Sequence, residues 1–236
     1  MLNAKDKRKI VYLDIETFAN VAYTWGIYEQ DIIGKKEEWF ILSYAYKVEG
    51  EKAVHVVSLP DFPGYKKNMG DDSELVRKLW KLFDEADVIV AHNADFDVKK
   101  SCARFLHHGL PPPSPFKTLC TKKLAKSRFK MDSNKLDHIG EYTGMGRKIK
   151  HEGFDLWLKC RDGDMKAWGR MCKYNKQDIV LLENIYLKMR PWSSTAPKLY
   201  FGTLCTHCGS DAIQWRGTYY AKKKGGKRFQ CTKCGI

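Results

Sequence analysis

The chain has 236 residues, 43% of them apolar and 13% aromatic, and its 42 lysines and arginines against 28 acidic residues give a formal net charge of +14. This composition excludes wholesale disorder and predicts a globular core with a small appendage. So large a positive charge favours a polyanionic partner, because each neutralised phosphate releases condensed counterions, although a merely soluble basic protein would share it.

The sequence does not predict a membrane or export segment. Its apolar runs all fall short of the roughly 18 residues that a membrane helix needs, and the charged stretch 1–10 is not followed by an apolar one. Four of the eight cysteines form two Cys-x-x-Cys pairs near the C-terminus, a spacing typical of metal ligands rather than disulfides. We therefore expect a reducing, cytoplasmic environment and no membrane partner.

The first half of the chain predicts strands followed by a helix. Apolar patterns predict a strand over 9–17 and two further strands within 39–59, on either side of a Glu-Gly-Glu turn. Residues 71–87 predict a helix with an apolar stripe along one face and with Asp72 or Ser73 as its N-cap.

Strand and helix then alternate along the chain. The apolar run 88–93 predicts a short strand, and the residues from Asp97 to His108 predict a helix. A last helix is predicted over 165–189, where a following proline would end it. This order predicts one α/β domain over residues 1–190.

A linker and a small second module are predicted after this domain. Residues 191–203 contain the proline, serine and threonine of a linker, and 204–236 hold the two cysteine pairs around a 22-residue spacer. The spacer predicts two strands joined by a basic turn around Gly225 and Gly226, so the module resembles a zinc ribbon. Four thiolates in this pattern form a closed, structural Zn²⁺ site, here Cys205, Cys208, Cys231 and Cys234.

The small module is also the more basic part of the chain. Residues 203–236 contain seven basic residues and one acidic residue, or +6, which leaves 35 − 27 = +8 for the first 202. This charge suits a phosphate backbone. A module of this size could equally dock on the first domain or bind another protein. The basic residues that would follow a backbone are Lys222, Lys223, Lys224, Lys227 and Arg228.

Two carboxylates interrupt the first predicted strand. Side chains at i and i+2 share a face, so Asp14 and Glu16 should lie side by side, opposite Leu13 and Ile15. Adjacent carboxylates repel unless a cation lies between them. An edge strand with one solvated face would show the same alternation.

Further acids occur at two predicted helices. Asn93 and the two acids that follow it lie at a helix start, where such residues commonly serve as caps. Tyr174 and Asp178 are four residues apart on one helix face, and Asp178 interrupts an apolar stripe there. A buried carboxylate needs a partner, which would be a lysine, an arginine or a metal.

Together these motifs resemble those of the DEDD (DnaQ-like) 3′-to-5′ exonuclease superfamily. Because its last motif contains a tyrosine, the chain resembles the tyrosine subgroup of this superfamily. That subgroup includes polymerase proofreading domains, and the chain also resembles free-standing, often phage-encoded ribonuclease H-like proteins. The resemblance covers about 9–192 and implies an α/β fold with a ribonuclease H-like mixed sheet flanked by helices, in a bacterial or phage-infected cytoplasm. The matching motifs are Asp14-Ile15-Glu16, Asn93-x-x-Phe96-Asp97 and Tyr174-x-x-x-Asp178.

The resemblance implies hydrolysis of phosphodiester bonds at single-stranded 3′ ends. Two Mg²⁺ or Mn²⁺ ions, hard cations that prefer carboxylate oxygens, would clamp the reacting phosphate. Tyr174 would orient the attacking water. The four implied ligands are Asp14, Glu16, Asp97 and Asp178.

The resemblance also implies contacts with the substrate. Thr17 and Phe18 would contact the terminal nucleotide, while His92 and Asn93 would border the same pocket. The spacing of the family motif favours the second acid of this region as the ligand, so Asp95 is expected to be a helix cap.

Two further pairs of residues allow two interpretations each. Trp25 and Tyr28 could stack on unpaired bases, a contact worth ~1–3 kcal/mol per base, but packing of the loop is the commoner role. His151 and Asp155 could line the site, although a lone histidine is more often a surface or satisfied residue.

Two classes of function compete for this sequence. One is a metal-dependent 3′-to-5′ exonuclease, with DNA favoured over RNA because of the polymerase-type resemblance. The other is a non-catalytic nucleic-acid-binding protein that retains the fold. Four converging carboxylates would repel phosphate in a pure binder, which favours the enzyme. Replication or repair proteins are possible further partners, but polymerase proofreading domains do not usually end in a zinc ribbon.

Overall fold

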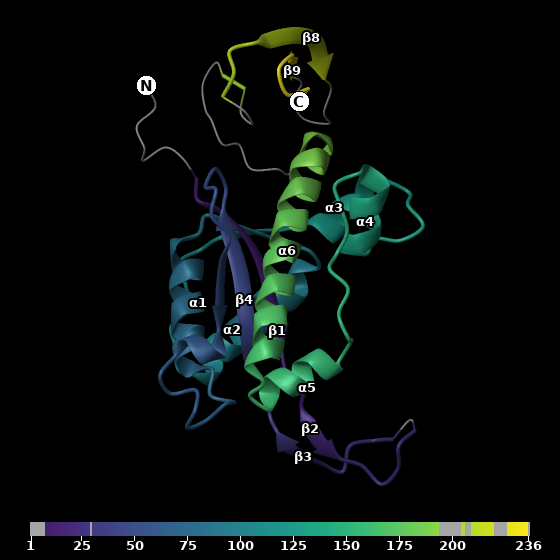
Figure 1. Cartoon of the computed structure of the whole chain (residues 1–236). Helices are drawn as coiled ribbons and strands as arrows, with labels where there is room; N and C mark the ends of the chain where they lie inside the picture. The colour runs from purple at the N-terminus through teal and green to yellow at the C-terminus, as the bar shows by residue number, and fades with distance from the viewer. Residues whose placement is uncertain (1–7, 29, 194–203, 206–208, 220–225, 236) are drawn as a thin grey trace.

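The computed structural model describes most of the chain, coloured from purple to yellow in Figure 1. The described residues are 8–28, 30–193, 204–205, 209–219 and 226–235.

Five strands form one mixed sheet in the order β5-β4-β1-β6-β7. The central strand β1 is antiparallel to β4 and parallel to β6, while β5 and β7 extend the sheet on either side. The predicted mixed sheet is therefore confirmed. The strands are β1 (Ile10–Thr17), β4 (Ile41–Val48), β5 (His55–Ser58), β6 (Val88–Ala91) and β7 (Lys117–Cys120).

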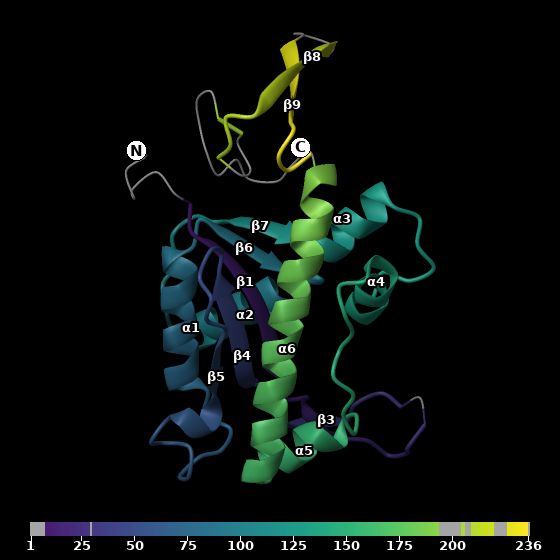
Figure 2. The same cartoon turned by 45° about the horizontal axis from the view of Figure 1, so that its top comes forward.

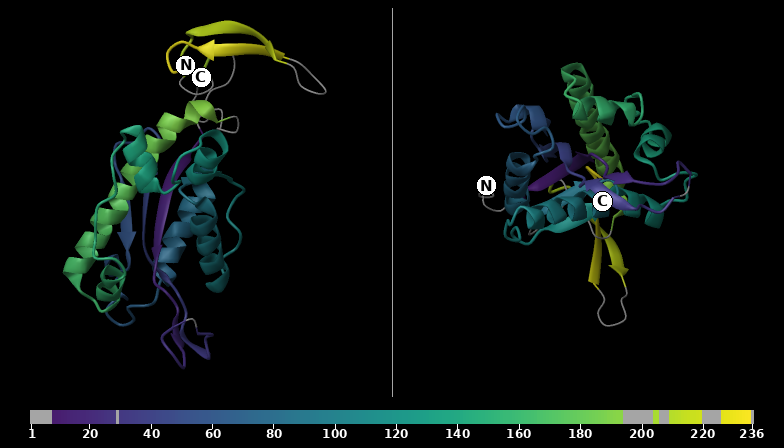
Figure 3. Two further views of the ribbon diagram at one scale, coloured as in Figure 1. Left: turned by 90° about the vertical axis from the view of Figure 1, so that its right-hand side faces the viewer. Right: turned by 90° about the horizontal axis from the view of Figure 1, so that it is seen from below.

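Helices cover both faces of this sheet (Figure 3, left). Because side chains of β1 alternate, Leu13 and Ile15 join the apolar cluster that includes α1, whereas Ile10 and Tyr12 pack against α6. Asp14 and Glu16 continue the second series, so they lie on the face that α6 crosses. The helices are α1 (Ser73–Glu85), α2 (Ala94–His107), α3 (Thr121–Arg128), α4 (Leu136–Thr143), α5 (Asp155–Arg161) and α6 (Met165–Met189), with 3-10 turns at Leu59–Asp61 and Arg190–Trp192.

Helix α2 begins earlier than predicted, at Ala94 rather than Asp97. Its N-cap is Asn93, which adopts a left-handed conformation with φ 66°. Asp95 is therefore a first-turn residue and not the expected cap, and its carboxylate forms an ion pair with Lys123 at 2.8 Å. Carboxylates are favoured throughout the first turn by the helix dipole, so these acids mark the start of the helix without preceding it.

A two-stranded arm projects from the sheet where a loop was predicted (Figure 1). Strands β2 (Val21–Tyr23) and β3 (Gly34–Glu37) pair antiparallel. Trp25 and Tyr28 between them are 89% and 79% exposed. The expectation that these two rings pack into a core was therefore wrong.

The C-terminal module contains a β-hairpin, as predicted (Figure 2). Its strands are β8 (Ile213–Tyr219) and β9 (Gly226–Cys231). Gly226 belongs to β9 rather than to the turn, and residues 220–225, like 194–203 of the predicted linker, lie outside the described residues. The domain limits therefore stay a prediction. In the described part of the chain, every helix is too short or too polar to cross a bilayer.

Candidate active site

Asp14 and Glu16 lie at the carboxyl-terminal end of the central strand. They pair with Ala45 and Ser43 of β4, and the register shifts between Glu16 and Thr17, the last residue of β1. Both side chains are half-buried beneath α6. The alternative interpretation, an edge strand with a solvated face, is excluded because β1 is paired on both sides.

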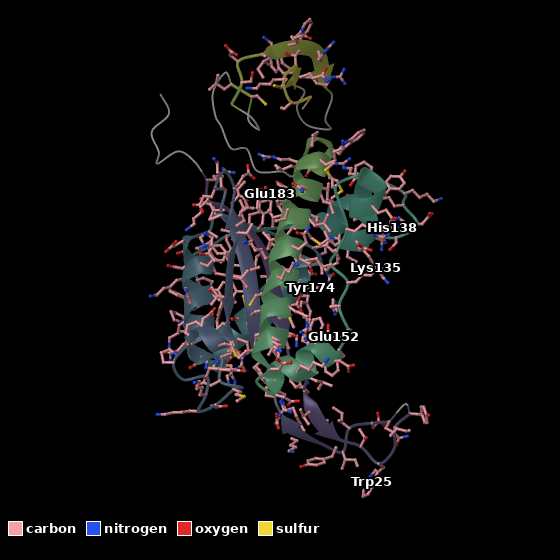
Figure 4. All side chains as sticks on the ribbon, viewed as in Figure 1. Trp25, Lys135, His138, Glu152, Tyr174 and Glu183 are labelled. Carbon is pink, nitrogen blue, oxygen red and sulfur yellow. The ribbon has the colours of Figure 1, made fainter. Side chains whose placement is uncertain are left out.

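Helix α6 brings a third carboxylate to this pair. Asp178 is 1% exposed, and its carboxylate meets those of Asp14 and Glu16, with one oxygen from each lying within 4.8 Å of the others. Tyr174, which is labelled on α6 in Figure 4, precedes Asp178 by four residues and so lies on the same face of the helix. Residues distant in sequence thus converge at one end of β1.

Asp97 approaches the same end of β1 from α2. It is 3% exposed, and its Oδ1 accepts a hydrogen bond from the backbone N–H of Ile15 at 3.1 Å. Asp97 lies beside the acidic trio, close enough for its charge to raise the pKa of Asp14. Asp95 pairs with Lys123 instead, and the choice of Asp97 over Asp95 as a metal ligand stays a prediction.

The electrostatic state of the cluster follows from burial and from the mutual repulsion of its carboxylates. Burial and then the charge of Glu16 raise the pKa of Asp14 well above its usual value. Burial and then Asp178 raise the pKa of Glu16 to about 8. Burial raises the pKa of Asp97 to about 7 and also raises the pKa of Asp178. Without a cation, this site therefore favours protonated carboxyls.

Lys148 lies at the acidic cluster, although the sequence did not single it out. Its Nζ lies 2.6 Å from Asp178 Oδ2 and 4.7 Å from the centroid of the Tyr174 ring. Burial opposes the charge of this ammonium group, but Asp178 and Tyr174 raise its pKa overall. The buried acid on α6 indicated a lysine, arginine or metal partner; which of many lysines it would be depends on the tertiary fold.

The segment before α5 is tied to α4, and this tie places Lys148. The backbone N–H of Lys148 donates to Asp137 Oδ1 at 2.8 Å, and Arg147 pairs with Asp137 at 3.0 Å. Gly140 allows the close approach, since a Cβ there would overlap the carbonyl oxygen of Gly146. The ammonium group is thus held in place over α6.

Three other side chains orient the site. Asn175 donates from Nδ2 to Asp14 Oδ2 at 2.7 Å, and its own Oδ1 accepts from Ser43 at 3.2 Å. The indole N–H of Trp157 donates to Glu16. The amide of Asn175 therefore fixes the rotamer of the Asp14 carboxylate on β1.

His151 also lies at the site. Its ring centroid is 4.7 Å from that of Tyr174 and 5.1 Å from that of Trp157. The side chain of His151 is exposed, and its Nδ1 accepts a hydrogen bond from the backbone N–H of Gly153 at 3.1 Å. The more common role expected for a lone histidine, a surface or satisfied residue, therefore describes it as well. Asp155 begins the short helix α5.

The donor set of the cluster fits hard divalent cations. Four carboxylates gather around one lysine ammonium, and burial, followed for Asp14 and Glu16 by repulsion from neighbouring carboxylates, raises their pKa values. Carboxylate oxygens are the ligands that Mg²⁺ and Mn²⁺ prefer. Asp14, Glu16 and Asp178 could therefore hold a metal ion.

Comparison with known families agrees with this geometry. A family model described as RNase_H superfamily matches residues 11–190. The chain belongs to the RNase H superfamily. Most members of that superfamily are nucleases, so the chain combines a nuclease fold with a buried acidic trio. No curated protein matches the chain.

The predicted substrate contacts of this RNase H superfamily domain lie in two different environments. Thr17 ends β1 and is half-buried, whereas Phe18 is 3% exposed and stacks on Phe40, with ring centroids 5.6 Å apart. His92 contacts Thr121 Oγ1 at 2.9 Å and the carbonyl oxygen of Asn134 at 3.0 Å, and burial lowers its pKa to about 4. The substrate roles of Thr17, Phe18, His92 and Asn93 stay predictions.

The cysteine cluster is separate from the acidic centre of the RNase H superfamily domain. Sulfur atoms of Cys205, Cys231 and Cys234 lie within 4.8 Å of one another, with Cys205 Sγ 3.6 Å from Cys234 Sγ. Cys208, the expected fourth ligand, lies outside the described residues. Thiolates are soft ligands that select Zn²⁺, so this cluster could hold a metal of a different class from the carboxylates.

Proposed function

We propose that this protein is a metal-dependent 3′-to-5′ exonuclease that hydrolyses single-stranded nucleic acid, with DNA favoured over RNA. The observation that carries the proposal is the convergence of Asp14, Glu16 and Asp178 at the end of β1, with Tyr174 on the same face of α6. The preference for DNA rests on the resemblance to polymerase proofreading domains alone.

The four carboxylates act together as the metal-binding group. Two bound Mg²⁺ or Mn²⁺ ions would supply a nucleophilic water and neutralise charge on the phosphate. Asp14, Glu16, Asp97 and Asp178 would hold these ions, and Asn175 keeps Asp14 turned toward the site. The pKa values raised in the metal-free protein mean that protons compete with the cations for the carboxylates.

Tyr174 orients the attacking water through its hydroxyl group. Burial and the neighbouring Asp178 raise the pKa of Tyr174, so the hydroxyl stays protonated near neutral pH and does not act as a general base. Lys148 lies against both this ring and Asp178, and so acts as a positioning residue for the pair. The chemistry then depends on geometry and charge more than on proton transfer by the protein.

The cysteine cluster belongs to the proposal as a structural Zn²⁺ site. Cys208 completes it as the fourth ligand beside Cys205, Cys231 and Cys234. A module of about 30 residues buries too little apolar surface to fold without such support.

The proposed activity is tested by digesting matched DNA and RNA oligomers labelled at the 5′ end. With Mg²⁺, we expect a ladder that shortens stepwise from the full length, faster for DNA. Asp97→Asn should abolish it. Asp95→Asn is the matched control, because its carboxylate lies two residues away and pairs with Lys123, and it should digest normally.

Three results would contradict the proposal. Immediate short products would indicate internal cleavage, and equal digestion by the Asp97→Asn protein would remove the assigned site. Tight binding without cleavage in Mg²⁺ or Mn²⁺ would favour the alternative function, a nucleic-acid-binding protein that retains the fold.

A further inference from the structure

The C-terminal hairpin exposes a pair of aromatic side chains. Trp215 of β8 and Phe229 of β9 are directly opposite each other in the antiparallel register, so they project from the same face. They are 64% and 53% exposed. Among the described residues of this module, the buried ones are Cys205 and Cys231, so the two rings are surface groups rather than core.

Basic side chains adjoin the two rings. Lys227 precedes Phe229 by two positions in β9 and therefore lies on the same face, where it is exposed. The register of β8 shifts after Trp215, and at this bulge the guanidinium of Arg228 donates to the Arg216 carbonyl oxygen at 3.0 and 3.1 Å. Arg216, Arg228 and Phe229 line one open depression of about 490 Å³.

We infer that this face of the hairpin, defined by Trp215, Phe229 and Lys227, binds single-stranded nucleic acid by stacking unpaired bases on its two rings. Lysine and arginine side chains contact the phosphate backbone beside the stacked bases. Every base has a π-face, so such a platform holds a strand without selecting its sequence. The inference takes its ligand class from the proposed nuclease function and gives the hairpin a role separate from cleavage.

Charge identifies the occupant of this face. The module carries seven basic residues and one acidic residue, so its field attracts polyanions. The β2–β3 arm is the informative contrast, because it also exposes aromatic rings but has four acidic residues and two lysines over 21–38. Exposed rings in an acidic setting do not predict phosphate binding, whereas the hairpin carries both rings and Lys227 on one face.

Binding is measured by fluorescence anisotropy with a labelled single-stranded 20-mer at several salt concentrations. The parent for all variants is the full-length, zinc-loaded Asp14→Asn protein without Mg²⁺, so that cleavage does not interfere. Trp215→Ala should raise Kd roughly 5- to 150-fold, which corresponds to stacking of ~1–3 kcal/mol per base, with an unchanged salt dependence. Lys227→Ala should instead lower the slope of log affinity against log salt by roughly 0.7.

Matched variants separate stacking from a general disturbance. Trp215→Tyr keeps a ring and should retain most of the affinity, whereas Trp215→Leu keeps apolar area without a ring and should lose it. Tyr142→Ala removes an aromatic side chain that is 70% exposed on α4, and Arg77→Ala removes an exposed arginine on α1; both should bind like the parent. Zinc content per chain reports whether the hairpin of each variant remains folded.

The inference is overturned if zinc-loaded Trp215→Ala and Phe229→Ala proteins bind like Tyr142→Ala. It is equally overturned if Trp215→Tyr binds as weakly as Trp215→Leu. The proposed nuclease function is judged separately, by digestion with the wild-type protein: a chain that binds through the hairpin but never cleaves would reject that function and leave this inference standing.

Discussion

The acidic centre and the cysteine cluster both gather ligand atoms from distant parts of the chain, but they relate to the fold in opposite ways. The carboxylates lie on β1, α2 and α6, next to apolar clusters that hold these elements together whether or not a cation is bound. Those clusters contain no residue beyond Met189 among the described ones, so the hairpin has no comparable core. The apolar core of the first domain positions the carboxylates without a metal, whereas we expect the hairpin to need metal binding at its cysteines in order to fold.

This difference sets the sign of each ligand group's contribution to stability. The carboxylates repel one another, so in the metal-free protein they lower the free energy of unfolding, and burial of the apolar core offsets this loss. The proposed Zn²⁺ site has the opposite effect, because the free energy of binding a metal at the cysteine cluster would add to the free energy of folding. Removing a ligand should therefore have opposite structural consequences in the two regions.

The largest effect is expected from loss of zinc. Cys231→Ser should unfold the hairpin, because apparent Zn²⁺ binding in comparable small modules contributes ~10–16 kcal/mol. Amide hydrogen exchange should show full loss of protection in β8 and β9, and unchanged protection in β1 and α6. Cys102→Ser, a half-buried cysteine on α2, is the control that should keep its zinc. Persistent protection of β9 in Cys231→Ser would show that the hairpin folds without the metal.

The acidic centre should show the reverse behaviour. Asp14→Asn or Asp178→Asn should lower the cleavage rate by roughly a thousandfold or more, since loss of even one preorganised polar group costs ~10²–10³ in rate. Asp14→Asn removes one of several repelling charges, so it should leave the metal-free protein as stable as the parent, or more so. Asp178→Asn also removes the ion pair with Lys148, so it is the less stable of the two. Rates and urea unfolding of the same preparations provide the check; a variant that is inactive because it is unfolded would contradict the comparison.

Stability of the metal-free, zinc-loaded protein should fall as pH rises. Burial and Asp178 raise the pKa of Glu16 from 4.5 to about 8, so between these values the folded protein binds more protons than the unfolded chain. The free energy of unfolding then decreases with pH across that window, and Mg²⁺ should restore it most strongly near pH 8. Urea unfolding at pH 5.5 and 8 measures the trend. Glu16→Gln should flatten it, and a rise in stability between these pH values would refute the assigned direction.

The smallest effect is expected from the orienting hydroxyl. Tyr174→Phe keeps the ring against His151 and Lys148 and removes only the group that positions water, so we expect cleavage to slow ~10- to 100-fold without loss of metal binding. Single-turnover rates measure this. A wild-type rate would mean that the ring serves only to pack.

Local sequence patterns were sufficient to predict which side chains share one face of a strand or a helix. Alternation along 9–17 and helical spacing along 165–189 placed Asp14, Glu16, Tyr174 and Asp178, because strand and helix periods fix which side chains share a face. The sequence did not predict the β2–β3 arm, because its aromatic rings are exposed and its strands are short. The sequence did not predict the role of Lys148 either, because its ion pair with Asp178 depends on how α4 holds an irregular segment against α6.

Metal binding in the absence of nucleic acid tests the central claim most directly. Isothermal titration calorimetry of the zinc-loaded protein with Mn²⁺ should show binding at pH 8 that weakens at pH 6. The reason is that protons compete with Mn²⁺ for carboxyl groups whose pKa values are raised. Asp14→Asn and Asp178→Asn should abolish this binding, and Asp95→Asn should leave it unchanged. If the parent protein binds no Mn²⁺, or if the Asp14→Asn variant binds it equally well, the acidic trio is not a metal centre and the proposed chemistry fails.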